Sequence, residues 1–247
     1  MNRTDLAAEA AEMLCDKTGM KVVSSSVGGV SITDVRAGKE ARSFGKPSGR
    51  YITLEGEPGA QCMAALLRRA AEQLVPREGT LLVAGLGNPD VTHDSLGALT
   101  VRSICAGKGR RYRVAAIETD VAVRTGIETA RLIRAAAGEL KADCVVAIDA
   151  LACKSPRYIG RTVQITDAGI TPGSGAAGDR REISAGTMGV PVIAVGVPLM
   201  SELSSVTHRE CDSGYAVTTG DINVTARLWA ETIAFSLNEL TGVAHSG

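Results

Sequence analysis

The sequence predicts an α/β protein with three layers, in which helices cover both faces of a mostly parallel sheet. Continuous apolar segments recur along the second part of the chain, at 81–87, 113–118, 144–151 and 190–197. Such segments are typical of strands that are buried on both faces. Helical patterns separate the first three segments, at about 94–106 and 125–140. Strands that alternate with helices in this way form right-handed βαβ units around a parallel sheet.

The second helical pattern has a clear packing face. The apolar residues that fall on one side of it are Ile127, Ala130, Ile133, Ala137 and Leu140. Further along, 162–166 indicates an additional strand, and roughly 220–241 predicts a long final helix that packs through residues such as Trp229 and Leu237.

The beginning of the chain predicts a β-rich elaboration of this core. We expect a helix over 4–15, a hairpin over 20–37 around a Val-Gly-Gly turn, a strand over 50–55 and a helix over about 60–74. No linker or change in composition divides the chain. We therefore expect a single α/β domain over 1–247, with the elaboration at 1–78 and the core sheet and helices at 79–247.

Composition argues against several classes of function. Lys plus Arg and Asp plus Glu both total 27, so the net charge is zero and a general polyanion binder is not expected. Aromatic residues make up only 3%, which leaves few platforms for stacking bases. No apolar stretch reaches about 18 residues, the length that a membrane span needs. We expect no direct nucleic-acid partner and no membrane association.

The cysteines and the N-terminus indicate a cytoplasmic protein. The six cysteines form no Cys-x-x-Cys pair, and several stand inside apolar segments, as expected of reduced thiols. The N-terminal residues begin an amphipathic helix with early acidic residues and do not have the pattern of a signal peptide.

Two aspartates stand just past the ends of predicted parallel strands. GLGNPDVTHDSLG (85–97) carries Asp94, and AIDALACKS (147–155) carries Asp149. In open α/β sheets, ligands bind beyond the carboxyl ends of the strands. Two carboxylates brought together there can share one proton, activate a water and protonate a leaving amine. On spacing alone an alternative stays open, in which Asp94 caps its helix and Asp149 anchors the neighbouring turn.

Other motifs give weaker indications. Residues 173–178 spell Gly-x-Gly-x-x-Gly, but no strand precedes them, so a dinucleotide turn is not expected. The three histidines are scattered and lack the spacing of a zinc site, so we expect neither metal nor cofactor. His93, beside Asp94, is a candidate ligand or proton carrier. Cys153 has no histidine base that the sequence can place near it. Arg180 and Arg181 either bind acidic side chains or lie in a solvated turn.

At these segments the sequence resembles the germination proteases of spore-forming bacteria. The resemblance is collinear over nearly the whole chain. It is carried by RTDLAAEA (3–10), RYITLE (50–55), GLGNPDVTHDSLG (85–97), TGIETARLI (125–133), CVVAIDALACKS (144–155), TVQITDAGITPGSGAAGDRREIS (162–184) and TMGVPVIAVGVP (187–198).

The resemblance implies an aspartic-type endopeptidase with a fold like that of the hydrogenase-maturation proteases. It implies that Asp94 and Asp149 are the catalytic pair. It also implies small acid-soluble spore proteins as substrates, whose degradation begins at germination in the spore core, and a homo-oligomer as the assembly.

The sequence departs from the family pattern at four places. Only Met1 and Asn2 precede RTDLA, where the family usually has a pro-segment. About 20 residues join Pro198 to the final helix, where the family has a longer segment, and this puts the usual assembly in doubt. TDVAVR (119–124) replaces a proline-glycine loop and places Asp120 near the same strand end. His93 stands where proline is common.

We therefore expect a cytoplasmic endopeptidase of the germination-protease type. Asn88 and the backbone amides of the 85–88 turn would hold the aspartate loop or polarise the scissile carbonyl. The 169–181 loop, with Gly173 and Ser174, would form a substrate wall, and Arg180 and Arg181 would recognise acidic side chains. Two alternatives stay open: a metal-dependent maturation endopeptidase, and a non-catalytic family member that binds spore proteins without cutting them.

Overall fold

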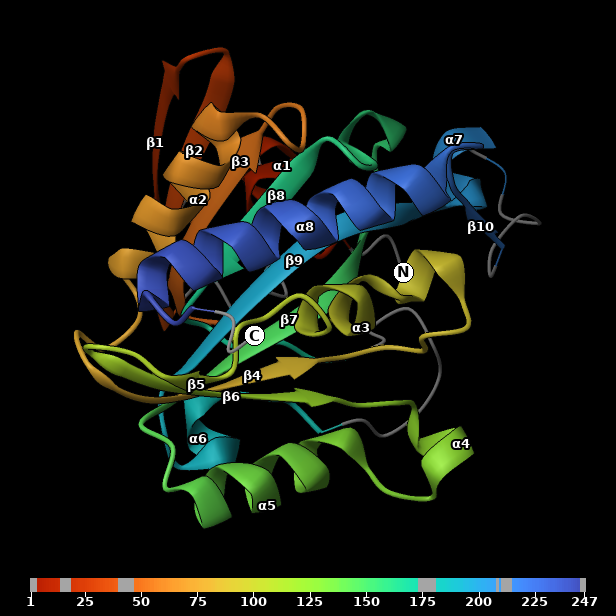
Figure 1. Ribbon diagram of the computed structural model, residues 1–247. Coiled ribbons are helices and arrows are strands. Elements are labelled where there is room, and N and C mark those ends of the chain that lie inside the picture. Colours follow the sequence, from red (N-terminus) through yellow and green to blue (C-terminus); the bar gives the residue numbers. More distant parts are fainter. Residues whose placement is uncertain are drawn as a thin grey trace.

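The protein is built on one large mixed β-sheet (Figure 1). The computed structural model describes residues 4–13, 19–39, 47–172, 181–207, 209 and 215–244. The strands of this part of the chain lie in the order β1-β2-β3-β8-β9-β7-β4-β6-β5, and β10 pairs with β9. Their bounds are β1 Met20–Val27, β2 Val30–Ala37, β3 Gly49–Glu55, β4 Gly79–Gly85, β5 Gly107–Lys108, β6 Tyr112–Glu118, β7 Cys144–Cys153, β8 Thr162–Thr166, β9 Val192–Glu202 and β10 Ala216–Val217.

The core of the sheet is parallel. Strands β6, β4, β7 and β9 are neighbours that all run in the same direction. The β1–β2 hairpin turns at Gly28 and Gly29, as predicted, and continues through β3 into β8 and β9 by antiparallel pairing. The N-terminal elaboration therefore widens the same sheet on the side away from β4 and β6.

Helices cover both faces of the sheet (Figure 1). On one face, α2 (Gln61–Glu72), α3 (Leu96–Val101) and α8 (Ile222–Thr241) pack over residues such as Leu81 and Val83. On the other, α5 (Thr129–Leu140) and α6 (Ala185–Met188) pack over Leu82 and Ala84. The expected α/β fold with helices on both sides of a central sheet is confirmed.

The remaining helices are short. Helix α1 (Ala7–Met13) packs on β2 and β3. The others are the 3-10 turns η2 (Thr92–Asp94) and η3 (Pro156–Tyr158) and the helices α4 (Ala122–Thr125) and α7 (Leu203–Thr207).

Two predicted helices differ from the structure. The segment 94–106 contains only α3, which follows η2. The segment 125–140 is divided, because Gly126 takes the left-handed conformation at φ 69° and ends α4 before α5 begins at Thr129. Ile127 was predicted on the packing face; this is wrong, because it lies in the link and is 50% exposed. The buried face of α5 consists of Ala130, Ile133 and Ala137.

Helix α3 lies so close to the ends of β4 and β7 that no side chain fits between them. A Cβ added at Gly97 would collide with the backbone nitrogen of Leu86 and would lie 2.6 Å from the carbonyl oxygen of Ile148. Gly85, at the end of β4, faces the backbone of Gly97 in the same way. These contacts join backbone to backbone, so rotation of a side chain cannot relieve them.

The substitution Gly97→Ala is therefore expected to destabilise the protein by about 3 kcal/mol or more, the upper range for overpacking. Urea unfolding followed by circular dichroism measures the change. Gly138→Ala is the matched control, because Gly138 lies within α5 and an added Cβ there meets nothing within 4 Å. The control should be neutral or should stabilise the helix by up to about 1 kcal/mol. Equal midpoints for Gly97→Ala and the unchanged protein would contradict the close packing.

Candidate functional site

The candidate site lies at the carboxyl ends of three parallel strands that are tied together by backbone hydrogen bonds. The amide of Leu86, just after β4, donates to the carbonyl of Ile148 in β7 at 2.8 Å. Thr119, just after β6, donates to the Gly85 carbonyl from its amide at 2.9 Å and from its hydroxyl at 2.8 Å. These bonds fix the ends of β4, β6 and β7 relative to one another, and the loop 86–95 begins from this frame.

Asp94 is held over the beginning of that loop. Its Oδ2 accepts a hydrogen bond from the Asn88 amide at 2.7 Å. Gly87 allows this approach, because it has φ 96° and a Cβ there would lie 2.8 Å from Asp94 Oδ1. The residue at the N-cap position of α3 is Ser95. The turn η2, which carries Asp94, contacts β7 and β9, so Asp94 lies next to the strand that carries Asp149.

Asp149 was predicted just past the end of its strand; this is wrong, because β7 continues to Cys153 by pairing with β9. Asp149 lies within β7, one residue beyond the point where its pairing with β4 ends. It is only 4% exposed, and its Oδ1 accepts the Ala150 amide at 3.0 Å. Side chains alternate along a strand, so Asp149 shares a face with Val145 and Ala147, the face that α5 covers. A buried carboxylate is costly unless it is hydrogen-bonded or paired. The burial of Asp149 therefore indicates that its carboxyl group has a specific role.

Arg124 joins two of the other predicted residues. Asn88 Oδ1 accepts the Asp90 amide at 3.0 Å and Arg124 Nη1 at 2.9 Å. Arg124 also pairs with Asp90 at 2.5 Å and, through Nε, with Asp120 Oδ2 at 3.2 Å. The side chain of Asn88 thus holds the aspartate loop, and Asp120 lies at its margin. Arg124 was not a sequence candidate; its only signal was its place in TDVAVR.

The remaining candidates divide into three groups. His93 is partly exposed on η2, directly before Asp94. Arg181 pairs with Glu128 at 3.5 Å and so lies against the beginning of α5. Gly173, Ser174 and Arg180 lie outside the described residues.

Cys153 is buried at the end of β7. Its Sγ lies 3.3 Å from the Ser155 carbonyl, and burial raises the pKa of the Cys153 thiol to about 12. Since the thiolate is the nucleophilic form, this cysteine stays protonated and unreactive near neutral pH.

The N-terminal segment supports β7 just beyond Asp149. Glu9 is 3% exposed, and its carboxylate accepts the amides of Lys154 at 2.9 Å and Ser155 at 2.5 Å and the hydroxyl of Thr4. Asp5 pairs with Ala152, accepting its amide at 2.9 Å and donating its own amide to the Ala152 carbonyl at 2.9 Å. The end of β7 is therefore fastened to residues almost 150 positions earlier in the chain. Sequence reasoning did not identify Glu9 or Asp5.

The described residues contain no group of three or more His, Cys, Asp or Glu side chains placed to hold a metal ion. None of their helices has both the length and the apolar character needed to cross a membrane.

Comparison with known proteins places the chain in a family. A family model for germination proteases matches residues 2–215. Germination proteases from Bacillus cytotoxicus and Bacillus mycoides are each 36% identical over 242 residues, covering 85% of this chain and 66% of the relative. One from Bacillus anthracis is 35% identical over 243 residues, with the same coverage. The match thus spans slightly less than two thirds of these relatives' length.

A solved structure also aligns with the chain. It is a NiFe hydrogenase maturation protease, HycI, from Thermococcus kodakarensis KOD1, with 19% identity and a TM-score of 0.41 over 68% of this chain and 99% of that chain.

The sheet and the polar groups at its strand ends define an α/β protein whose candidate site lies at the carboxyl edge of a parallel core. Within that class, the chain belongs to the germination protease family.

Replacing Arg124 with Gln should loosen the aspartate loop. The substitution removes the ion pairs to Asp90 and Asp120, and exposed pairs of this kind stabilise by up to about 1 kcal/mol. Hydrogen exchange at the amides of Asp90 and Val91 should therefore become about fivefold faster. Mass spectrometry of the exchanged loop peptide measures this.

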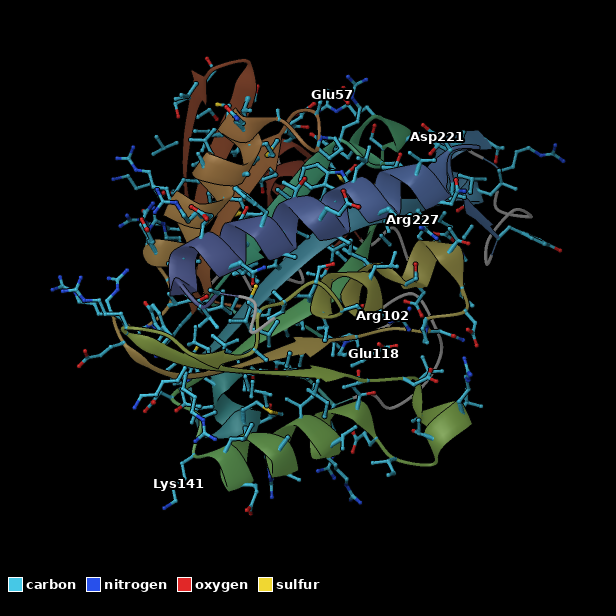
Figure 2. All side chains as sticks on the ribbon, in the orientation of Figure 1. Glu57, Arg102, Glu118, Lys141, Asp221 and Arg227 are labelled. Carbon is cyan, nitrogen blue, oxygen red and sulfur yellow. The ribbon has the colours of Figure 1, made fainter. Side chains whose placement is uncertain are left out.

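The control for this experiment is Arg102→Gln, which breaks a similarly exposed pair with Glu118 at 2.6 Å, outside the loop (Figure 2). It should leave exchange in the loop unchanged. If both variants exchange alike, Arg124 does not hold the loop.

Glu9→Gln should destabilise the protein by about 1.5–3 kcal/mol. The glutamine side chain has one oxygen in place of two, so its NH2 group would face one of the amides of Lys154 and Ser155, which both donate to Glu9 in the unchanged protein. That amide would lose its acceptor. Glu57→Gln is the comparison, since Glu57 pairs with Arg161 at the surface, and this substitution should cost less than about 1 kcal/mol. Thermal unfolding of both variants distinguishes the two positions; equal losses would refute the support of β7 by Glu9.

Proposed function

We propose that the protein is an endopeptidase that begins the degradation of small acid-soluble spore proteins during germination. Membership of the germination protease family supports the class of reaction and the substrate. Such a substrate would place the protein in the cytoplasm of the spore. The observation that carries the proposal is the position of Asp94 and Asp149, which both lie beyond the point where the pairing of β4 with β7 ends, on elements that contact each other.

In the proposed mechanism the two aspartates share one proton. Like charges at short range raise the pKa of one carboxyl, so one member stays protonated while the other is ionised. The ionised member takes a proton from water, whose oxygen attacks the carbonyl carbon of the scissile bond. The protonated member gives its proton to the leaving nitrogen as the C–N bond breaks. The two products are a carboxylic acid and an amine.

The contacts of the two carboxylates suit this division of work. Each carboxylate accepts a backbone amide, so burial distinguishes them. Asp94 is partly exposed, which favours its ionised form. Asp149 is almost completely buried, which favours a neutral form. We therefore assign the base to Asp94 and the acid to Asp149 for the first step. Asn88 positions Asp94 through its amide.

An extended substrate backbone would pass along the stems of the 169–181 loop. Ile170 and Ile183 form an antiparallel bridge there, with N–O distances of 2.9 and 2.7 Å. Pairing through the backbone suits a peptidase, because it depends little on the side chains of the substrate.

Substitution of the pair tests the mechanism. Asp94→Asn and Asp149→Asn should each lower the rate of cleavage of a recombinant small acid-soluble spore protein by at least about 10³-fold, since each removes a proton-transfer group. Mass spectrometry of the fragments over time gives the rate, and circular dichroism checks the fold. Asp120→Asn is the matched control at the same edge, because Arg124 and the Val121 amide already bind its carboxylate. It should retain the rate within about tenfold.

The outcomes are distinct. Undiminished cleavage by either pair variant removes that aspartate from the catalytic role. Loss of cleavage on chelation, with recovery when metal is returned, replaces the mechanism with a metal-dependent one. A folded protein that binds the substrate and yields no fragments is a binding protein.

A further inference from the structure

A basic groove runs between α5 and α6, on the face of the sheet away from α8. Two adjoining hollows, each of about 530 Å³, share Arg134 and the α6 residues Gly186, Thr187 and Met188 as lining. Arg131 and Arg181 line the first hollow, and Lys141 lines the second. Figure 2 shows Lys141 at the far end of α5. The groove therefore follows the length of this helix.

The charge of the groove is unbalanced. Arg131 and Arg181 share one carboxylate, that of Glu128, at 3.4 and 3.5 Å. Their side chains remain 69% and 57% exposed, so both guanidinium groups still face solvent. Arg134 is exposed and makes no ion pair with any residue that the structure describes. Three arginines thus stand against one acid in a protein whose net charge is zero.

Glu182, directly after Arg181, is not among the residues that line the two hollows. Burial raises the pKa of Tyr51, on β3, and the charges of Asp167 and Glu182 raise it further. The charge of Glu182 therefore also reaches the N-terminal part of the sheet.

The floor of the groove would admit a polypeptide backbone. Ala130 and Met188 are buried beneath it. Gly186 leaves open space, because a Cβ there would meet only Ser184 Oγ, at 3.9 Å. An apolar floor between guanidinium groups can accommodate the backbone of an extended chain. Carboxylates on the side chains of that chain would bind the arginines, since arginine binds carboxylates through two parallel hydrogen bonds.

The groove is connected to the candidate site by the fold. Helix α5 begins near the carboxyl ends of the strands, where Arg181 and Glu128 meet. Ile183, two residues after Arg181, packs in the same cluster as Leu86 and Ala147. This is the face of the sheet on which Asp149 lies, so a chain leaving the site past Ile183 would enter the groove.

We propose that this groove is a second binding region, which holds an acidic segment of the polypeptide substrate outside the aspartate pair. The choice of a polypeptide rests on the proposed function; the preference for carboxylates rests on the groove. Arg134 is the specificity-determining residue, because it is the arginine of the groove without an acid partner in the described part of the chain.

The test is direct binding of a fluorescein-labelled hexaglutamate peptide, followed by fluorescence anisotropy. The full chain with Asp94→Asn is used, so that cleavage cannot interfere. Adding Arg134→Gln should weaken binding about tenfold, the loss expected for one charged hydrogen-bonding group. Arg227→Gln is the matched control, because Arg227 is exposed on α8, over the opposite face, and it should bind as before (Figure 2).

Each outcome decides the matter. Equal affinity in the Arg134 and Arg227 variants overturns the proposal, as does tighter binding of a labelled oligothymidylate than of hexaglutamate, which would make the groove a nucleic-acid site. Cleavage of a small acid-soluble spore protein by the unchanged chain is measured separately. Peptide binding that depends on Arg134, with no cleavage, would refute the proposed function and leave the groove in place.

Discussion

The direct contact between the backbone of α3 and the ends of β4 and β7 is the constraint on which the candidate site depends. Gly85 and Gly97 leave no side chain between the helix and the sheet, and the Leu86 amide bonds to Ile148 across the strand ends. Because backbone atoms have no rotamers to adjust, the loop that carries Asp94 begins from a fixed position beside the strand that carries Asp149. The aspartates can be placed accurately only because this frame is rigid.

The N-terminal elaboration belongs to the same frame. It widens the sheet through the pairing of β3 with β8, and its first residues bind the end of β7 through Asp5 and Glu9. Glu9 satisfies amides that would otherwise be buried without an acceptor. Strand β7 is thus held by β4 and β9 along its length and by the N-terminus at its end, so the elaboration and the core stabilise one strand together.

Charge is distributed unevenly over this neutral protein. Arg124 lies among Asn88, Asp90 and Asp120, where its charge is compensated and serves to hold a loop. The arginines of the α5–α6 groove share a single acid and remain exposed. Arginine therefore has a structural role at one edge of the sheet, where acidic partners compensate its charge. On the face of the sheet covered by α5 and α6, arginines with fewer acidic partners are available to a ligand.

Much of the fold follows from local pattern. The apolar segments predicted the four strands of the parallel core, the Val-Gly-Gly turn predicted the hairpin, and 162–166 is β8 as expected. The division between α4 and α5 was missed, because the apolar spacing continues through Ile127 while Gly126 breaks the backbone. Arg124 and Glu9 were missed as well, since the contacts that give them their roles, from Arg124 to Asn88 and Asp90 and from Glu9 to the Lys154 amide, join residues 34–36 and about 145 positions apart.

The sequence by itself determined that Asp94 follows β4 and that Asp149 belongs to the next apolar strand segment, because periodicity and glycine turns act over a few neighbouring positions. It did not show that β7 continues past Asp149 to Cys153, because that extension depends on pairing with β9. The tertiary structure decided which side chains hold them, which arginines keep an acid partner and which face of the sheet carries the groove. Those outcomes depend on contacts between residues far apart in the chain, and such contacts exist only once the sheet has formed.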